Sequence, residues 1–297
     1  MTTVMDKPVA TPLAAGRPLL PREHGAWGIL LIPFATAAGV AGVFDVKTAL
    51  LLASVLCFYI ARTSYLKRDF LWTFILLAMS TGCTAPLLLV WKLWWLAAFG
   101  GVAGLLAFRK TGRSVAMQLL AVGGLTLTAP AAWYAGTGRL GTQALLLWLL
   151  NALYFAGGVF YVKMHVAAAV GSVLTRRARL LHGHISPMDA TKRVPPNGKS
   201  EHHPAVGRKP LESLAEKARL GAAVIAYHLG LVIVLLALAA GGVVTFPVLL
   251  AYAPVVVRAF AGIARLSPTL RIRRLGWTEV AYSVVYAIVL IAAFRFG

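Results

Sequence analysis

The segment NALYFAGGVFYVKMHV, residues 151–166, combines a long apolar run with polar side chains at helical spacing. Successive polar or small residues stand three or four positions apart: Asn151, Tyr154, Gly158, Tyr161 and His165. Such spacing places them on one face of an α-helix. Because a polar group without a partner is costly in the hydrocarbon region of a membrane, the pattern predicts a spanning helix whose polar face lines a cavity. The alternative is that Asn151 only joins two helices and that the tyrosines belong to an interfacial belt.

The composition of the whole chain supports a membrane protein. Of its 297 residues 59% are hydrophobic and 13% are charged, whereas soluble domains carry roughly 25% charged residues. The net charge of +20 does not indicate a nucleic-acid partner, because the basic residues lie between apolar runs and form no basic domain. Cys57 and Cys83 fall inside apolar runs, which indicates neither a disulfide framework nor a metal site. Residues 1–20 do not have the pattern of a removable signal peptide.

Nine apolar runs extend this interpretation along the chain. A helix needs roughly 20 apolar residues to cross a bilayer, and the fourth run is short, so eight spans remain the alternative. We expect an all-α, polytopic membrane bundle with spans at about 25–44, 48–66, 70–91, 93–108, 114–136, 141–163, 219–241, 244–264 and 277–295.

The distribution of Lys and Arg predicts the orientation of these spans. Of the 29 such residues, all but Lys47, Lys92, Arg139 and Arg295 lie in the N-terminal tail or around the loops after the second, fourth, sixth and eighth spans. Basic residues favour the cytoplasmic side, so the N-terminus is predicted inside and the C-terminus outside. We expect a cytoplasmic tail at 1–20 and a single bundle at 21–297, with a long, basic, partly disordered cytoplasmic loop at about 166–217.

Further polar residues gather at the predicted cytoplasmic ends of the spans. Glu279, Tyr282, Ser283 and Tyr286 share one face of the last span, although the helix dipole alone would explain Glu279. These groups are predicted to form a polar pocket, rich in Arg and Tyr, that opens to the cytoplasm. Its candidate residues are Arg22, Trp27, Tyr59, Arg62, Tyr65, Asp69, Asn151, Tyr154, Tyr161, Lys163, Arg258, Glu279, Tyr282 and Tyr286.

Basic side chains in such a pocket could bind an anionic head group directly. Glu23, His24 and His165 are the catalytic candidates, because each could transfer a proton. His228 lies near the middle of a span, where a hydrogen bond to a backbone carbonyl is as good an explanation as a function. No metal site is predicted, since a solvated basic loop explains His182, His184, His202 and His203 better than metal binding does.

The stretch PREHGAWGILLIPF, residues 21–34, resembles the signature of the YwiC-like family of bacterial membrane proteins. This resemblance implies a multi-pass protein of the bacterial cytoplasmic membrane and no particular reaction.

A more distant resemblance is to the UbiA superfamily of intramembrane prenyltransferases. It rests on nine spans, an inside N-terminus, polar clusters at the second and sixth spans and a long loop after the sixth. In that family two aspartate-rich motifs hold Mg²⁺ on a prenyl diphosphate. Trp148 and Tyr154 match the second motif, but Asn151 and Gly158 stand near its two aspartates, and Asp69 is the sole acidic residue around the second span. The resemblance implies a UbiA-like arrangement with degenerate motifs; no cofactor is expected unless that site is active with Mg²⁺.

Three functions fit these observations. The first is a UbiA-like binder, or transferase, of a prenyl or other lipid-like anionic substrate held in the cytoplasm-facing pocket. The second is a transporter of a small anion or metabolite through the same basic pocket; prolines interrupt several spans, as in transporters with broken helices. The third is a non-catalytic membrane partner that uses the long basic loop. The lipid bilayer is the expected surrounding in each case, protein partners are unknown, and the sequence leaves open whether the chain is an enzyme.

Overall fold

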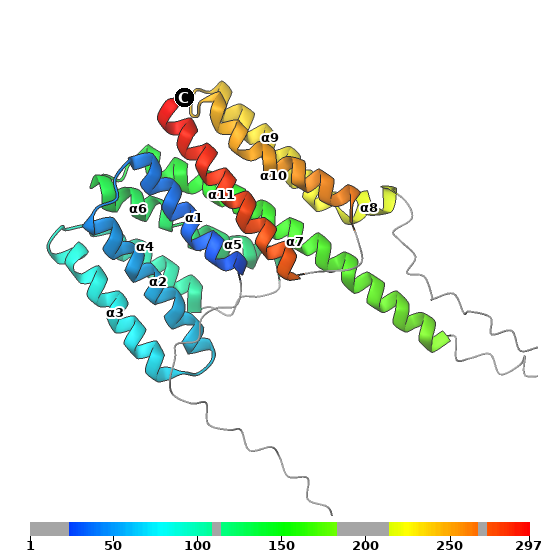
Figure 1. The fold of residues 1–297 in the computed structure, drawn as a ribbon, viewed down its shortest axis with the longest axis horizontal. Coiled ribbons are helices and arrows are strands. Elements are labelled where there is room, and N and C mark those ends of the chain that lie inside the picture. The colour runs from blue at the N-terminus through cyan, green and yellow to red at the C-terminus, as the bar shows by residue number, and fades with distance from the viewer. Residues whose placement is uncertain (1–23, 109–113, 183–213, 267–271) are drawn as a thin grey trace, which may run out of the picture.

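The computed structural model describes residues 24–108, 114–182, 214–266 and 272–297. These ranges contain helices and no strands (Figure 1), which confirms the predicted all-α bundle. The helices are α1 (His24–Ala41), α2 (Val46–Leu66), α3 (Phe70–Leu89), α4 (Trp95–Phe108), α5 (Val115–Leu125), α6 (Thr128–Thr137), α7 (Thr142–His182), α8 (Leu214–Leu220), α9 (Ala222–Ala240), α10 (Phe246–Ala264) and α11 (Ile272–Phe296).

Seven segments of the described chain are long and apolar enough to cross a membrane. They are α2, α3, the pair α5 and α6, α7, α9, α10 and α11, and α1 and α4 contain shorter apolar stretches, Trp27–Ala41 and Trp95–Leu106. Every predicted run therefore coincides with apolar helix. The number of helices that cross the bilayer and the orientation of the spans stay predictions.

The expected span at 114–136 is divided into two helices. α5 ends at Leu125 and α6 begins at Thr128. Pro130 has no backbone N–H, so the carbonyl of Thr126 loses its regular helical donor. The hydroxyl of Thr126 donates to the carbonyl of Val122 at 2.9 Å, and that of Thr128 donates across to Leu30 of α1 at 3.1 Å. The interrupted helix is thereby tied to α1.

Helix α7 extends well beyond the expected span at 141–163. It continues to His182, so the first part of the predicted loop at 166–217 is helical. Residues 167–181 are rich in Ala, Leu and Arg, which have high helix propensity. The end of the predicted loop is also helical, because α8 begins at Leu214.

The helices form a layered bundle with α1 near its middle (Figure 1). α2 and α3 form a hairpin in which the Ser54 hydroxyl lies 3.0 Å from that of Ser80 and 2.6 Å from that of Thr84. On the other side of α1, α9 and α10 pack beside α11 and α7. α1 itself packs against α6 and α11. Its approach to α11 depends on Gly39, where a Cβ atom would overlap Ile291.

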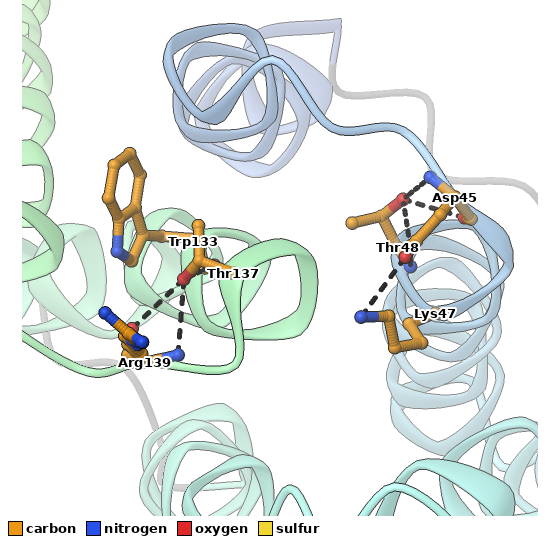
Figure 2. A network of polar contacts seen from close by, with 6 residues as sticks. All are labelled: Asp45, Lys47, Thr48, Trp133, Thr137 and Arg139. Carbon is orange, nitrogen blue, oxygen red and sulfur yellow. Dashed lines mark hydrogen bonds and ion pairs between the residues drawn. The ribbon is translucent and has the colours of Figure 1, made fainter.

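The turn between α1 and α2 is held by a capping box (Figure 2). The Asp45 carboxylate accepts from the Thr48 N–H at 3.0 Å, and the Thr48 hydroxyl accepts from the Asp45 N–H at 2.8 Å. Lys47 Nζ lies 3.2 Å from the same carboxylate. Partial burial alone would raise the pKa of Asp45, but the Thr48 N–H and the Lys47 ammonium outweigh it and hold this pKa below its usual value.

We expect Asp45→Ala to lower the stability of the purified protein by about 1 kcal/mol, because α2 then loses its N-cap. The ionised carboxylate stabilises the folded state above its ordinary pKa of 3.8, and this contribution is lost as the pH falls through the lowered folded value. Thermal unfolding in detergent at about pH 6 and about pH 3 should show a smaller difference between wild type and variant at the lower pH. Asp45→Asn, which keeps a capping oxygen, is the control; an equal loss in both variants would contradict a capping role.

Candidate functional site

The centre of the site is an ion pair between Arg258 of α10 and Glu279 of α11. Arg258 is 7% exposed and Glu279 22%. The guanidinium carbon lies 4.4 Å from the ring centre of Tyr161 on α7 and 5.2 Å from that of Tyr282 on α11. Three helices therefore surround one cation. Cation–π contacts with the two tyrosine rings replace part of the stabilisation that hydration would give the charge in water.

The ion pair does not use the full hydrogen-bonding capacity of Arg258. A guanidinium has five N–H donors, whereas one carboxylate accepts through two oxygens. Nη1 of Arg258 is paired with Oε1 of Glu279, whereas the buried Nε and Nη2 atoms of Arg258 have no hydrogen-bond partner among the described residues. Donors buried in this way are costly unless another polar group reaches them. The arrangement can thus accept a further polar or anionic group.

A cluster of three tyrosines lies beside the ion pair, nearer the N-terminal end of α7. Tyr154 stacks on Tyr286 with ring centres 3.9 Å apart, and Tyr252 meets Tyr286 edge to face at 5.3 Å. The Tyr252 hydroxyl donates to the carbonyl of Leu150 at 2.8 Å. All three side chains are buried, so they do not form an interfacial belt.

Asn151 links the polar face of α7 to α1. Its amide nitrogen donates to the Thr36 hydroxyl at 3.0 Å and to the Leu147 carbonyl at 2.8 Å. The side chain is fully buried, and its Oδ1 atom has no hydrogen-bond partner in the described part of the chain. Asn151 thus joins two helices, as the alternative interpretation held, while the tyrosines of the same face turn toward α10 and α11.

Two histidines lie on the helices around the pair. His165 meets the edge of Tyr161 with ring centres 4.6 Å apart, and its Nε2 atom has no hydrogen-bond partner among the described residues. His228 of α9 contacts the Val224 carbonyl through Nδ1 at 2.8 Å, which is the structural explanation given above. A Cβ atom at Gly157 would stand 3.3 Å from His228 Nε2, so this glycine lets α7 approach α9.

Of the other sequence-predicted residues, some contact another helix or cap one, and others lie outside the described residues. Trp27 and Tyr59 meet edge to face at 5.3 Å, which joins α1 to α2. Tyr65 is 45% exposed, and the Asp69 carboxylate caps α3 by accepting from Trp72 N–H at 3.3 Å.

Arg62 and Lys163 are half-buried on α2 and α7. Arg22 and Glu23 lie outside the described residues, and of His24 the backbone alone is described, at the start of α1.

Sequence reasoning missed Tyr252 and Thr36. Tyr252 lies on the buried face of α10 with Val248 and Val255, and its spacing of four and three residues from these two apolar side chains was a usable signal. Thr36 carried no such signal, because a threonine in a span commonly bonds its own backbone, as this one does to the Pro33 carbonyl at 2.8 Å.

The described residues do not fit a magnesium site. No group of three or more His, Cys, Asp or Glu side chains comes together in the described ranges. Mg²⁺ requires oxygen ligands in octahedral geometry, whereas Glu279 is engaged by Arg258 and Asp69 caps a helix.

Fold and site together define a multi-pass, all-α membrane protein with a buried Arg–Glu pair inside its bundle. A family model described as YwiC-like protein matches residues 20–134, which confirms the resemblance predicted from residues 21–34. The match covers α1 to α5 and ends within α6, so Arg258 and Glu279 lie outside it. Neither the search of curated proteins nor the search of solved structures found a match.

We expect Glu279→Leu to destabilise the protein by about 3 kcal/mol, because it leaves the Arg258 charge buried without its carboxylate. Arg258→Met combined with Glu279→Leu should recover much of this loss, since neither charge then remains. Thermal or denaturant unfolding in detergent of both single variants and the double variant measures the coupling. Additive effects of the two changes would mean that the charges do not stabilise each other.

Proposed function

We propose that this protein binds the anionic head group of a prenyl or other lipid-like molecule, with Arg258 as the anchor. The observation that carries the proposal is a buried guanidinium with donors to spare. A phosphate or carboxylate is a strong acceptor for such a group, because the bonds are charge-assisted and formed away from water.

Glu279 has a defined role in this proposal. It compensates the Arg258 charge while no ligand is bound, which lowers the cost of keeping the cation in the bundle. When a head group arrives, it shares or replaces the carboxylate on the guanidinium. The Arg258 charge is therefore compensated both with and without a bound ligand.

The tyrosine cluster suits the apolar part of the same molecule. Tyr154 lies seven residues from Tyr161 on α7, about 10 Å deeper along the helix axis. Aromatic side chains offer apolar area to an isoprenoid or acyl chain. The head group would then contact Arg258, and the tail would run along α7 toward Tyr154. The distribution of basic residues predicts that the head group lies on the cytoplasmic side of a bacterial inner membrane.

Arg258 and the tyrosine cluster support binding of such a molecule, and Mg²⁺-dependent prenyl transfer is not part of the proposed function. A UbiA-like arrangement of the helices is compatible with ligand binding. His165 would be a candidate for proton transfer, because its ring contacts Tyr161.

We expect the purified protein in detergent to bind a labelled prenyl diphosphate, and Arg258→Gln to weaken this binding about ten- to hundredfold, because charge-assisted hydrogen bonds are lost. Arg265→Gln is the matched control, since Arg265 is an exposed arginine at the end of the same helix. Arg258→Lys, which keeps the charge but loses the planar fork, should give an intermediate affinity. Retained folding is checked by the unfolding midpoint of each variant, and binding with and without Mg²⁺ tests the metal.

Equal affinity of wild type, Arg258→Gln and Arg265→Gln would remove Arg258 from the site. Failure of wild type to bind any prenyl diphosphate or anionic lipid would overturn the proposed function itself.

Transport of a small anion is the second candidate, and the interrupted helix at α5 and α6 favours it. Broken helices near the middle of a bundle occur in transporters, where they supply backbone groups to a substrate. If this candidate is right, proteoliposomes containing the protein should take up a small labelled anion, and Arg258→Gln should abolish the uptake. If the vesicles are tight, no tested anion is taken up and the protein binds prenyl diphosphate, transport is excluded and lipid binding is retained.

A further inference from the structure

A second cationic feature lies at the opposite end of α11, in a groove on the outer surface of the bundle. The groove has a volume of about 490 Å³ and runs along α1 between α2 and α11. Its walls are apolar, formed by residues such as Leu31, Phe34, Ala35 and Leu52. Among the described residues, Arg295 is the one charged side chain that lines it. It shares no residue with the Arg258 site.

The end of the groove is shaped by Gly42, in the turn after α1. Gly42 has φ +68°, which glycine adopts without strain. The Arg295 guanidinium occupies the place that a Cβ atom of residue 42 would need. A side chain at this position would push the guanidinium away, so Gly42 lets it rest across the turn at the mouth of the groove.

The dimensions and position of the groove match one leaflet of a bilayer. Arg295 is in the last turn of the candidate span Leu275–Phe296, and Phe44 beside it is 68% exposed, as expected for residues at the membrane interface. From Gly42 to Leu31 the groove follows α1 for about 16 Å. This length is close to half of the roughly 30 Å of hydrocarbon thickness.

The charge of Arg295 is open to an outside partner. No carboxylate in the described residues forms an ion pair with Arg295. The nearby Asp45 is already engaged by Thr48 and Lys47 (Figure 2). A cation at interface depth, above an apolar channel as long as a leaflet, is complementary to a lipid phosphate above its acyl chain.

We propose that this groove binds an anionic phospholipid of the leaflet that surrounds the C-terminal end of α11. The phosphate contacts Arg295 across Gly42, and one acyl chain lies along Phe34, Ala35 and Leu31. A single interfacial arginine favours an anionic over a zwitterionic lipid by about fivefold in affinity.

The test is native mass spectrometry of the delipidated, full-length protein with phosphatidylglycerol, phosphatidylcholine and inorganic phosphate in separate titrations. Phosphatidylglycerol should bind about fivefold tighter than phosphatidylcholine, and Arg295→Gln should remove that difference. Arg139→Gln is the matched control, because Arg139 is exposed on the turn after α6 and lines no part of the groove. Ala35→Phe, which fills the apolar channel without touching Arg295, should weaken both lipids.

The outcomes decide between the lipid and simpler explanations. Equal binding of the two lipids to wild type, or equal effects of Arg295→Gln and Arg139→Gln, would overturn the proposal. So would binding of inorganic phosphate as tight as that of phosphatidylglycerol, or an Ala35→Phe variant with unchanged lipid affinity. Loss of prenyl binding at Arg258 has no bearing on any of these results.

Discussion

A cation held inside a membrane bundle must be compensated by the protein, because the hydrocarbon around it offers neither water nor counter-ions. Arg258 meets this requirement through Glu279 on the next helix and through the faces of Tyr161 and Tyr282. α10, α11 and α7 must therefore face one another at this depth. The tyrosine cluster lies between the same three helices, and the Tyr252 hydroxyl donates to the Leu150 carbonyl. The packing of α7, α10 and α11 against one another is therefore linked to the buried charge of Arg258.

Helix α1 connects this half to the rest of the molecule. Thr36 accepts from Asn151 of α7, the Leu30 carbonyl accepts from Thr128 of α6, and Gly39 brings the helix against α11. The segment matched as YwiC-like contains α1 and the helices on its far side, while the ion pair belongs to the helices beyond it. Glu279 and Arg295 are sixteen residues apart on α11, about 24 Å along its axis. The two proposed anion-binding positions thus stand near opposite ends of one helix, and α1 lies beside both.

The polar face of α7 was predictable because helical spacing alone puts Tyr154 and Tyr161 on one side. Pairing them with Glu279, Tyr282 and Tyr286 was also predictable in outline, since all are polar groups that lipid would not tolerate. Tyr65 and Asp69 were grouped with them by depth, yet the first is exposed and the second caps α3. Depth along a span says nothing about the direction in which a side chain points, and short-range capping satisfies a carboxylate before any distant partner can.

The amino-acid sequence by itself determined that this chain is an all-α membrane bundle, because apolar runs of spanning length admit no other structure in lipid. It also determined which side chains needed partners. The tertiary structure alone decided the partners. Arg258 forms an ion pair with Glu279, Asn151 donates a hydrogen bond to Thr36, and Arg295 lies against Gly42 beside an apolar groove. The physical reason is that helical periodicity specifies a face within each helix, whereas the neighbour of that face depends on packing between segments far apart in the chain.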